Sequence, residues 1–376
     1  MRERLSAAVV VLGMLPVLAA VPAAEQAQDR IERVKGVALS HVKVVEDTWR
    51  QVKAQHGLLT TSEPACNVRD VRYACEPKTY VDGRNFGAAG DYRLALKNLI
   101  YCLRNDINEQ NAVLKQYLYY YIAYYYVKYA GEGAFEKARR YLDMLFKEIP
   151  DSRFLPDALI LYADTYYHEG DHFQEALEAY QRAYDRLMQM AREVRGEHQV
   201  YLKGKANYAR YRKAECMMLL GRHAEAKQEF QAVRGRTAAF PRVNLLASLG
   251  VARSLWQEKK YEEAFREFKA TVERAEAAGV RDILAGAYAG LGDCYFEKKD
   301  YRRALWYYLK VMVQYFDAQE YVPKATYLAG RCWLKIAEEG KGGEGARAMA
   351  RYYLQKAAAM KDSVWAEQAQ KVLDNL

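Results

Sequence analysis

Proline is scarce in this sequence. Only 8 prolines occur in 376 residues, whereas the helix-favouring residues Ala, Leu, Lys, Arg and Glu are abundant. Hydrophobic residues make up 51% and charged residues 28% of the chain, which is typical of an ordered globular protein. The composition therefore excludes a proline-rich or disordered chain and favours a helical one.

Motifs of nucleotide-binding and hydrolytic enzymes are also absent. The sequence contains no G-x-x-x-x-G-K-[ST] and no G-x-S-x-G. The glycine-rich residues 340–343 lack both the spacing and the hydroxyl of a phosphate-binding loop, so we interpret them as a solvated loop. We therefore predict no catalytic residues, no cofactor and no enzymatic activity.

One pattern formally matches a zinc-peptidase signature. Residues 168–172 read HEGDH, in which His168 and His172 would hold a metal and Glu169 would act as the base. That chemistry needs both histidines on one face of an unbroken helix, and the intervening Gly170 disfavours such a helix. A zinc metallopeptidase is therefore kept only as a remote alternative, and no metal site is predicted.

The six cysteines fall into two groups. Cys66 and Cys75 flank a polar, irregular segment, and in an oxidising compartment we predict that they form a disulfide. No C-x-x-C occurs, so neither a thioredoxin-like motif nor haem attachment is supported. The other four lie inside predicted helices and are interpreted as small buried residues: Cys102, Cys216, Cys294 and Cys332.

The N-terminus has the three regions of a secretory signal. Arg2 and Arg4 form its charged region, residues 5–21 its apolar region and residues 21–24 its cleavage region. The apolar run is shorter than the roughly 20 residues that span a bilayer. We therefore predict a signal peptide over residues 1–24, cleaved after Ala23 or Ala24, with an uncleaved anchor as the alternative. No cysteine follows the apolar region, so no lipid anchor is predicted.

The chain is basic, with a net charge of +9 from 57 basic and 48 acidic residues. A basic exported protein suits anionic lipid headgroups, lipopolysaccharide or acidic protein partners. No basic run alternates with aromatic residues as in a strand-binding groove, so nucleic acid is not a predicted partner.

Residues 25–56 carry apolar residues at three- and four-residue steps with polar residues between them. The spacing predicts one N-terminal amphipathic helix, whose apolar face consists of Ile31, Val34, Ala38, Val42, Val45, Trp49 and Val52. Packing of this helix on the rest of the chain is the main interpretation, and a short self-associating coiled coil is the alternative. Residues 57–84 lose this periodicity and contain glycine and proline, so we predict a linker there, stapled by the Cys66–Cys75 disulfide.

A pattern of paired helices recurs from about residue 85 to the C-terminus. Residues 285–312 show it most clearly, because small Gly292 and Ala304 allow two helices to approach on either side of a polar turn. The small residue of the second helix recurs as Ala95, Ala138, Ala176, Ala226, Ala264, Ala304 and Ala350. The spacing reproduces W-x2-L-G-x2-Y…A-x3-F, with Tyr288 in place of Trp and Tyr308 in place of Phe. Ala95 has no convincing helix before it, so that unit is expected to be atypical.

On these residues the chain resembles tetratricopeptide-repeat (TPR) proteins. The resemblance implies an all-α, right-handed solenoid of antiparallel helix pairs over residues 85–376, with about six to seven repeats and atypical end units. Residues 149–158 and 315–325 each place a proline at the start of a new helix, which is similar to periplasmic TPR proteins such as the outer-membrane assembly lipoprotein and the Tol–Pal coordinator. This implies a periplasmic protein, although the missing lipid-anchor cysteine departs from the first of these.

In TPR proteins the first helix of each pair lines a concave groove, and the resemblance implies a set of partner-binding residues here. Carried over by register, they are Asp164, Tyr167, Tyr208, Tyr211, Glu215, Arg253, Trp256, Asp293, Phe296 and Arg331. The aromatic residues would supply desolvated area, and the charges would fix the register of an extended or helical protein segment. Packing between repeats is the alternative role for the aromatic residues.

Residues 116–130 contain eight tyrosines. We interpret this run as a helix packed on both flanks, with a binding platform for sugar rings or a peptide as the alternative. The predicted function is that of an exported, non-enzymatic scaffold that binds envelope proteins through the groove. A glycan-binding or anionic-lipid-binding envelope module is the alternative, and no oligomeric state is predicted.

Overall fold

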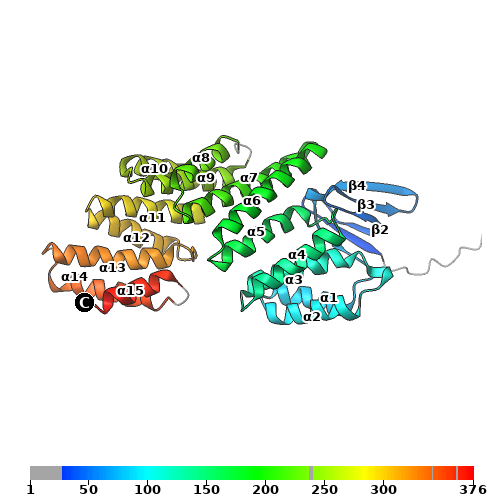
Figure 1. The fold of residues 1–376 in the computed structure, drawn as a ribbon, viewed down its shortest axis with the longest axis horizontal. Coiled ribbons are helices and arrows are strands. Elements are labelled where there is room, and N and C mark those ends of the chain that lie inside the picture. The colour runs from blue at the N-terminus through cyan, green and yellow to red at the C-terminus, as the bar shows by residue number, and fades with distance from the viewer. Residues whose placement is uncertain (1–27, 237–239, 341, 361–362) are drawn as a thin grey trace, which may run out of the picture.

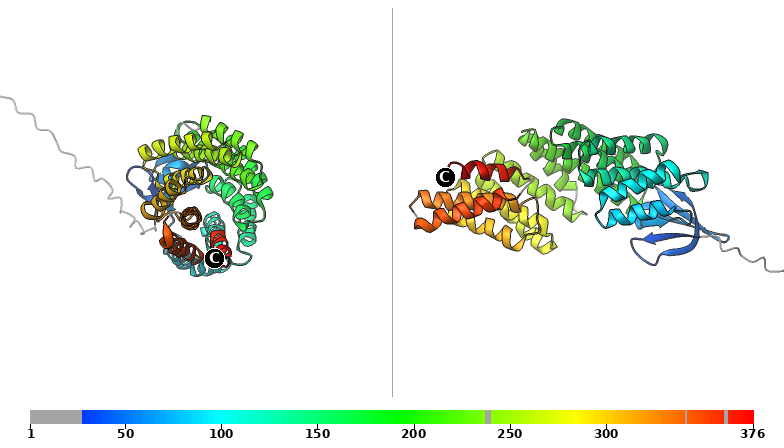
Figure 2. Two further views of the ribbon diagram at one scale, coloured as in Figure 1. Left: turned by 90° about the vertical axis from the view of Figure 1, so that its left-hand side faces the viewer. Right: turned by 90° about the horizontal axis from the view of Figure 1, so that it is seen from below.

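The computed structural model describes residues 28–236, 240–340, 342–360 and 363–376. In this part of the chain a small antiparallel sheet precedes fifteen α-helices, which stack side by side along the long axis of the molecule (Figure 1). Viewed down that axis, the helix pairs wind around it (Figure 2). The predicted α-solenoid is therefore confirmed, and the predicted signal peptide lies outside the described residues.

The solenoid consists of seven antiparallel helix pairs and a terminal helix within the described residues. The pairs are α1 (Lys78–Ala88) with α2 (Tyr92–Asn105), α3 (Leu114–Tyr129) with α4 (Ala134–Glu148), α5 (Leu155–Glu169) with α6 (Phe173–Glu193), α7 (Gly196–Leu219) with α8 (His223–Arg236), α9 (Pro241–Gln257) with α10 (Tyr261–Ala278), α11 (Arg281–Glu297) with α12 (Tyr301–Gln314), and α13 (Val322–Glu338) with α14 (Gly343–Ala358). The terminal helix α15 (Val364–Leu373) packs on α13 and α14. It covers the end of the array, as a terminal repeat requires.

The turn inside each pair has a defined backbone conformation. Gly170 and Gly221, which follow α5 and α7, have φ angles of +90° and +75°. Lys259 and Lys299 occupy the same turn position in later pairs, with φ angles of 60° and 61°. A left-handed residue at this point ends the first helix and reverses the chain, and it is least strained when it is glycine.

The core of the solenoid is built on the small residues that the sequence indicates. All seven alanines that mark the second helices have 0% exposed surface: Ala95, Ala138, Ala176, Ala226, Ala264, Ala304 and Ala350. A large buried side chain follows each alanine by one helical turn, as Tyr308 follows Ala304. A Cβ atom added to Gly292 would lie 2.6 Å from Tyr308, so this glycine is needed for the approach of α11 to α12.

The first helix pair begins earlier than predicted. The predicted solenoid started at residue 85 and left Ala95 without a preceding helix, whereas α1 begins at Lys78 and packs on α2. Gly83 of α1 faces Leu99 of α2, where an added Cβ would lie 2.6 Å from the leucine side chain. The first unit is therefore a complete pair.

The N-terminal sheet has five antiparallel strands. They are β1 (Asp29–Arg33), β2 (Leu39–Asp47), β3 (Gln51–His56), β4 (Leu59–Pro64) and β5 (Val68–Arg72), and they lie in the order β4-β3-β2-β1-β5. Ile31, Val52 and Val71 are fully buried on the face that packs toward the first helices. The sheet therefore shares a hydrophobic core with α1, α2 and α3.

This sheet corrects the predicted amphipathic helix over residues 25–56. Val34 and Val45, assigned to the buried face of that helix, are 48% and 47% exposed. In β3 the side chains instead alternate, so that Val52 and Ala54 are buried on either side of a more exposed lysine. Gly36, with a φ angle of +92°, forms a turn in the middle of the expected helix. The apolar residues of short strands joined by turns happen to fall at three- and four-residue steps, which imitates the spacing of a helix. The coiled-coil alternative is wrong for the same reason, because these residues do not form a helix.

The predicted linker over residues 57–84 and its disulfide are also corrected. The segment contains β4, β5 and the start of α1. Cys66 lies in a 3-10 turn (Ala65–Asn67) before β5, and Cys75 lies after β5. A five-residue strand spans about 16 Å, which exceeds the roughly 7 Å between Cα atoms that a disulfide tolerates. Both thiols are free, so the predicted Cys66–Cys75 disulfide is wrong for this structure.

Trp49 joins the sheet to the solenoid. Its side chain is fully buried, and its indole N–H donates to Asp151 Oδ1 at 3.2 Å in the loop before α5. Its backbone N–H donates to the Asp151 carbonyl, and its own carbonyl lies 2.7 Å from the ring nitrogen Nε2 of His198 in α7. The connection between β2 and β3 is therefore held to both α5 and α7.

Candidate protein-binding groove

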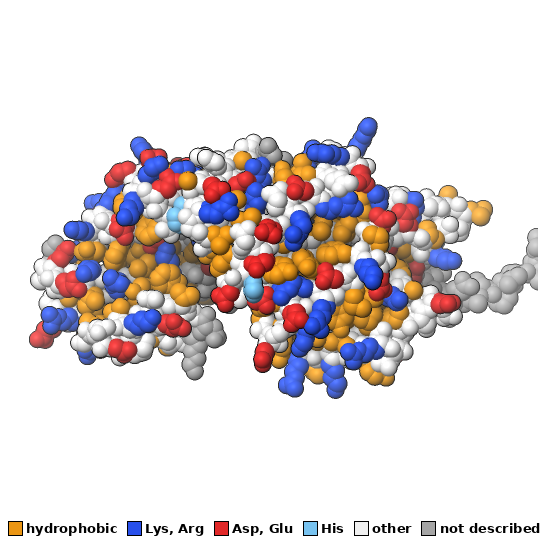
Figure 3. All heavy atoms as spheres, viewed as in Figure 1, with side chains coloured by type: hydrophobic (Ala, Val, Ile, Leu, Met, Phe, Trp, Pro, Cys, Tyr) orange, Lys and Arg blue, Asp and Glu red, His pale blue; other side chains and the backbone are white. Residues whose placement is uncertain are grey.

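The first helices of successive pairs form the inner wall of the solenoid. Helices α5, α7, α9 and α11 contact one another in turn, whereas the second helices of neighbouring pairs do not approach as closely within the described residues. The array must therefore curve toward the first helices. In the space-filling view the surface is hollowed between the N-terminal and C-terminal halves (Figure 3).

One residue of each first helix, immediately after the small residue that faces the second helix, lies along this wall. We call these residues the inner row: Arg84, Tyr124, Asp164, Glu215, Arg253, Asp293 and Arg331. The last five belong to the predicted groove set. Arg84 and Tyr124 were missed, although the pairs Gly83-Arg84 and Ala123-Tyr124 repeat the same register. Arg84 lies in the segment that was predicted to be a linker, and Tyr124 lies in a uniform run of tyrosines, so the register was not recognised at either residue.

Asp164 is held by two neighbours and is only partly exposed. The hydroxyl of Tyr180 on α6 donates to Asp164 Oδ1, and Arg212 Nη2 on α7 lies 3.7 Å from the same oxygen. The Arg212 guanidinium also lies 3.9 Å from the centre of the Tyr167 ring. Burial, Asp164 and the Tyr180–Asp164 hydrogen bond raise the pKa of Tyr180, so its hydroxyl stays protonated as a donor. These contacts join the third pair to the fourth.

Glu215 is shared by two arginines. Its Oε2 atom accepts a hydrogen bond of 2.7 Å from Arg212 Nη1 one turn earlier on α7. Its Oε1 atom lies 3.6 Å from Arg253 Nη1 on α9. The Arg253 side chain is 41% exposed, against 13% for Arg212. Arg253 therefore has a long, incomplete ion pair and is the most accessible charge in the centre of the inner row.

The loop between α12 and α13 reaches this part of the wall. Tyr321 packs over α11, where its hydroxyl oxygen would lie 2.9 Å from a Cβ added to Gly286. Glu320 next to it interacts electrostatically with Arg253. Burial raises the pKa of Glu320, and the attraction of Arg253 opposes that rise. The wall around Arg253 is therefore mixed in charge and bordered by tyrosine.

Asp293 repeats the arrangement of Asp164 three pairs further along. The Tyr308 hydroxyl on α12 donates to Asp293 Oδ1 at 2.8 Å, and Lys324 on α13 forms an ion pair with Asp293 Oδ2. Asp293 is 8% exposed, so little of it is available to a partner. Arg331 donates to the Tyr327 hydroxyl at 2.8 Å.

The predicted aromatic residues mostly pack between helices. Tyr211 is 6% exposed, and its ring lies 5.6 Å from that of Phe230 on α8. Tyr208 is half-buried beside Tyr211, and Phe296 is half-buried against Tyr301. The indole N–H of Trp256 is enclosed and has no hydrogen-bond partner in the described structure. Trp256 therefore supports the fold more than it offers a contact to a partner.

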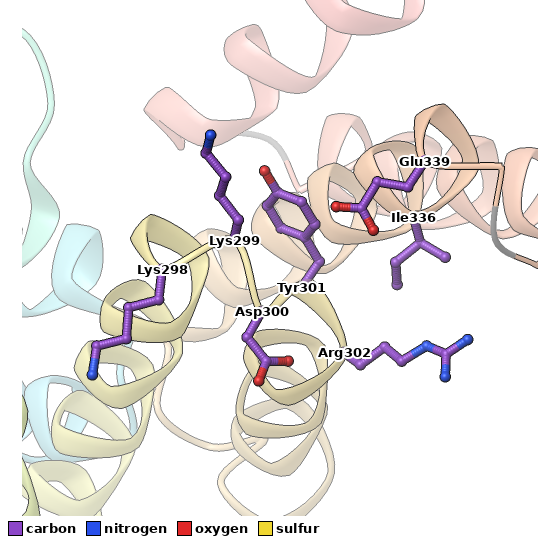
Figure 4. Close-up of a pocket in the computed structure, with 7 residues that line it drawn as sticks. All are labelled: Lys298, Lys299, Asp300, Tyr301, Arg302, Ile336 and Glu339. Carbon is purple, nitrogen blue, oxygen red and sulfur yellow. The ribbon is translucent and has the colours of Figure 1, made fainter.

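The described hollows do not form a deep ligand pocket on this wall. The one beside Arg253 and Glu215 has a volume of about 20 Å³, enough for a single water molecule. A larger hollow of about 500 Å³ lies at the turn between α11 and α12, where Lys298, Tyr301 and Ile336 contribute to its lining (Figure 4). It lies at the end of the helices and not on the inner row. The inner wall is thus suited to contact with a surface or a chain segment rather than to enclosure of a small molecule.

The HEGDH segment does not form a zinc site. Helix α5 ends at Glu169, and Gly170 reverses the chain with a φ angle of +90°, so His172 lies outside that helix. The Glu169 carboxylate is bound to Arg139, with Oε2 at 2.8 Å from Nη1. Among the described residues no group of histidine, cysteine and acidic side chains is arranged to hold a metal ion. The remote metallopeptidase alternative has the wrong geometry.

The tyrosine-rich run forms α3, and most of its rings are packed. Tyr117 and Tyr119 are buried, and Tyr120 stacks on Phe154 with ring centres 4.4 Å apart. Tyr121 lies beneath the Arg84 guanidinium at 4.5 Å. The packed-helix interpretation therefore describes these rings better than a free platform does. Within the described part of the chain, no helix combines the length and the apolar character needed for a membrane span.

The stacked helix pairs, their small-residue contacts and the inner row define a TPR fold. No protein-family model matches the chain, and no curated protein matches it either. Among solved structures it is similar to a tetratricopeptide repeat protein from Parabacteroides merdae, with a TM-score of 0.54 and 18% identity over 79% of this chain and 96% of that one. It also aligns with the apo form of RapI (TM-score 0.48, 13% identity, 78% of this chain and 79% of that one). A third match is PilW, described as a type IV pilus biogenesis factor, with a TM-score of 0.45 and 14% identity over 71% of this chain and 100% of that one.

Proposed function

We propose that this chain is an exported TPR scaffold that binds a protein of the bacterial cell envelope along its inner row and catalyses no reaction. The proposal rests on the contrast between Arg253 and the acidic residues of the row. Asp164 and Asp293 are each satisfied by a tyrosine of their own pair and a cation of the next pair, whereas Arg253 forms a long ion pair with Glu215, a carboxylate that Arg212 also binds. A carboxylate or carbonyl of a bound segment would complete the coordination of Arg253.

The shape of the wall supports a protein partner over a small ligand. The neighbours Tyr167, Tyr208 and Tyr321 are half-buried, so each can add apolar contact area without a large loss of side-chain freedom. The wall is held in place by the ion pairs between repeats, so little ordering is required on binding. A preformed wall of aromatic residues around an incompletely paired arginine fits an extended or helical segment with at least one acidic side chain.

The envelope location is supported by the sequence alone. Residues 1–24 have the organisation of a signal peptide, and residues 149–158 and 315–325 resemble periplasmic TPR proteins of the outer-membrane assembly and Tol–Pal types. We expect the mature protein to begin near residue 24 or 25 and to fractionate with the periplasm. An N-terminus that still contains residues 5–21, in protein recovered from the cytosol, would contradict export.

Crosslinking in intact cells tests the binding function. Arg253→Glu should abolish recovery of one defined envelope protein, because it reverses the accessible charge of the row. Arg266→Glu on α10 is the matched control, since Arg266 is exposed on a second helix and makes the same charge change. Equal recovery from both variants would reject the inner row as the binding site.

The glycan or anionic-lipid alternative gives a different outcome. Net positive charge would then drive binding to anionic vesicles or lipopolysaccharide, and that binding would weaken steeply with salt. It would survive both single variants, because neither removes most of the charge. Salt-sensitive binding of this kind, without a captured protein, would replace the scaffold proposal.

A further inference from the structure

Strand β4 leaves one edge of the N-terminal sheet open. It is the terminal strand in the order β4-β3-β2-β1-β5, and residues 59–62 are all exposed. At the opposite edge, Arg153 from the loop before α5 donates to the Val68 carbonyl of β5. The hairpin of β3 and β4 extends beyond the helices at one end of the molecule (Figure 1). Of the two edges, only that of β4 is therefore free of such a contact within the described residues.

The hairpin geometry identifies the backbone groups on this edge. A two-residue turn, Gly57-Leu58, joins β3 to β4, and His56 pairs with Leu59. In such a hairpin the residues that flank the turn exchange both hydrogen bonds, so alternate residues from Leu59 onward face β3. The backbone N–H of Ala65, which belongs to the same alternation, donates to the Arg50 carbonyl at 3.2 Å. The N–H and C=O groups of Thr60 and Ser62 therefore point outward.

The edge carries few of the features that normally prevent strands from pairing, and its one proline, Pro64, lies at the end of β4. Residues 59–63 contain no lysine and no proline, and β4 pairs with β3 without a register shift. The other pairings in the sheet all contain a bulge or irregularity. Leu58 and Leu59 at the tip are 105% and 71% exposed. A regular edge beside an apolar tip is a template for another strand.

We propose that two copies of this chain pair through β4, antiparallel and related by a two-fold axis at Thr61, so that their sheets become continuous. Thr60 of one copy lies opposite Ser62 of the second copy, and the reverse pair completes the interface. All four outward N–H and C=O groups of each strand are then bonded. Leu58 faces Pro64 of the second copy, which covers part of the exposed leucine.

The sequence of β4 favours this register and a second copy as the occupant. A two-fold axis at Ser62 would place Thr60 opposite Pro64, which has no N–H to donate. An axis at Thr60 would place Ser62 opposite Leu58, which belongs to the turn. With the axis at Thr61, the single charged residue of the strand, Glu63, faces Leu59 of the second copy and keeps its ion pair with Arg33. No like charges are opposed, so the strand is complementary to itself.

A disulfide trap tests the register. In an antiparallel pair without mutual hydrogen bonds the Cα atoms lie about 4.5 Å apart, close enough for a disulfide. Thr61→Cys, in a Cys75→Ser background that removes the exposed thiol, should crosslink to a dimer under mild oxidation. The matched control is Thr60→Cys, whose two copies would lie roughly 9 Å apart and should crosslink at least about tenfold more slowly. Equal rates, or a monomeric Thr61→Cys protein, would overturn the proposal.

Sedimentation velocity tests the same interface without a crosslink. The apparent mass of the wild-type protein should rise toward that of a dimer as the protein concentration is raised to about 300 µM. A high concentration is needed because a contact this small gives a weak dimer. Thr60→Pro removes one outward N–H but leaves the ladder with β3, which an edge strand tolerates. The variant should remain monomeric with an unchanged unfolding transition. A dimer that persists in Thr60→Pro, or a wild-type protein that stays monomeric throughout, would contradict β4 pairing. Because β4 is remote from Arg253, a failure here leaves the inner-row proposal intact.

Discussion

The hydroxyl of Tyr308 on α12 donates a hydrogen bond of 2.8 Å to Asp293 on α11, and Lys324 of the following pair neutralises the same carboxylate. Tyr180, Asp164 and Arg212 repeat this relationship three pairs earlier. In each case an acidic residue of the inner row joins its own pair to the next one. The groove therefore contains two kinds of charged residue: acids that hold the repeats together, and an arginine, Arg253, that remains accessible.

Removal of the Tyr308 hydroxyl should destabilise the solenoid. Tyr308→Phe leaves the buried Asp293 with one partner fewer, so we expect a loss of about 1–3 kcal/mol in the free energy of unfolding. Tyr307→Phe is the control, because Tyr307 is half-buried on the same helix and makes ring contacts. Urea unfolding followed by circular dichroism measures both. Similar midpoints for the two variants would show that the Tyr308–Asp293 bond contributes nothing.

The buried carboxyl of Asp47 should give the protein a characteristic pH dependence. Its side chain is 1% exposed and accepts a hydrogen bond of 2.7 Å from the Tyr73 hydroxyl, while Oδ1 is 4.0 Å from Arg153. Burial raises the pKa of Asp47, and the attraction of Arg153 opposes that rise. An acid whose pKa is higher in the folded state stabilises the fold at low pH, and this stabilisation is lost as pH rises above about 3.9.

Comparison with Asp47→Asn isolates this contribution. The amide cannot ionise, so the stability of the variant relative to wild type should increase as the pH is raised from about 4 to 7. Urea unfolding at several pH values measures the difference. A relative stability that falls over this range would mean that Arg153 and the tyrosines hold the pKa of Asp47 below its ordinary value.

The free thiols give a direct check on the N-terminal sheet. Cys75 is exposed and Cys66 is half-buried, while the four helical cysteines are buried. Burial raises the pKa of the thiols of Cys66 and Cys75, so both should react slowly but measurably with iodoacetamide at pH 8. The native protein should therefore gain one or two labels without reductant, Cys75 first, and all six only in urea. Protection of Cys66 and Cys75 until a reductant is added would reinstate the disulfide.

Trp49 should control the attachment of the sheet to the helices. Trp49→Ala removes a fully buried side chain and its bond to Asp151, so we expect a loss of about 3–5 kcal/mol. Hydrogen exchange in β2 and β3 should increase more than exchange in α11. Trp306→Ala is the control, because Trp306 is 57% exposed on α12 and should change stability by less than about 0.5 kcal/mol. Equal exchange of the sheet in both variants would contradict the anchor.

The helical part of the fold was predictable because its signal is repeated. The contact of a small residue with a large one recurs once in every pair, as in Gly292 with Tyr308, and each copy supports the register of the others. The prediction of the register therefore does not depend on any single side chain. The first pair escaped detection because Gly83 and Arg84 lie in a segment whose prolines and glycines read as a linker.

The sheet was not predictable by the same reasoning because its strands are short. Apolar residues on alternate positions of β2 and β3, interrupted by turns, also fall at three- and four-residue steps over a limited stretch. Gly36 and Gly57 were the informative residues, since both adopt positive φ angles in turns between strands. Burial of Trp49 depends on Asp151 and His198, which are distant in sequence and carry no local signal.

The predicted groove residues follow one register along the first helices, but the structure shows that they are not all free to contact a partner. Position alone does not distinguish Arg253 from Asp293, because the difference lies in partners on neighbouring pairs. Tyr308 donates a hydrogen bond to Asp293, and Lys324 neutralises its charge. Glu215, the ion-pair partner of Arg253, also accepts a hydrogen bond from Arg212. Such competition between side chains of three helices requires the three-dimensional arrangement.

The most direct test of the account is the affinity of the mature protein for the envelope protein captured by crosslinking, measured for Arg253→Glu and Arg266→Glu by isothermal titration calorimetry. The inner-row account predicts that Arg253→Glu raises Kd at least about tenfold, while Arg266→Glu stays within about twofold of wild type. Equal affinities of the two variants would place the binding surface elsewhere and contradict it.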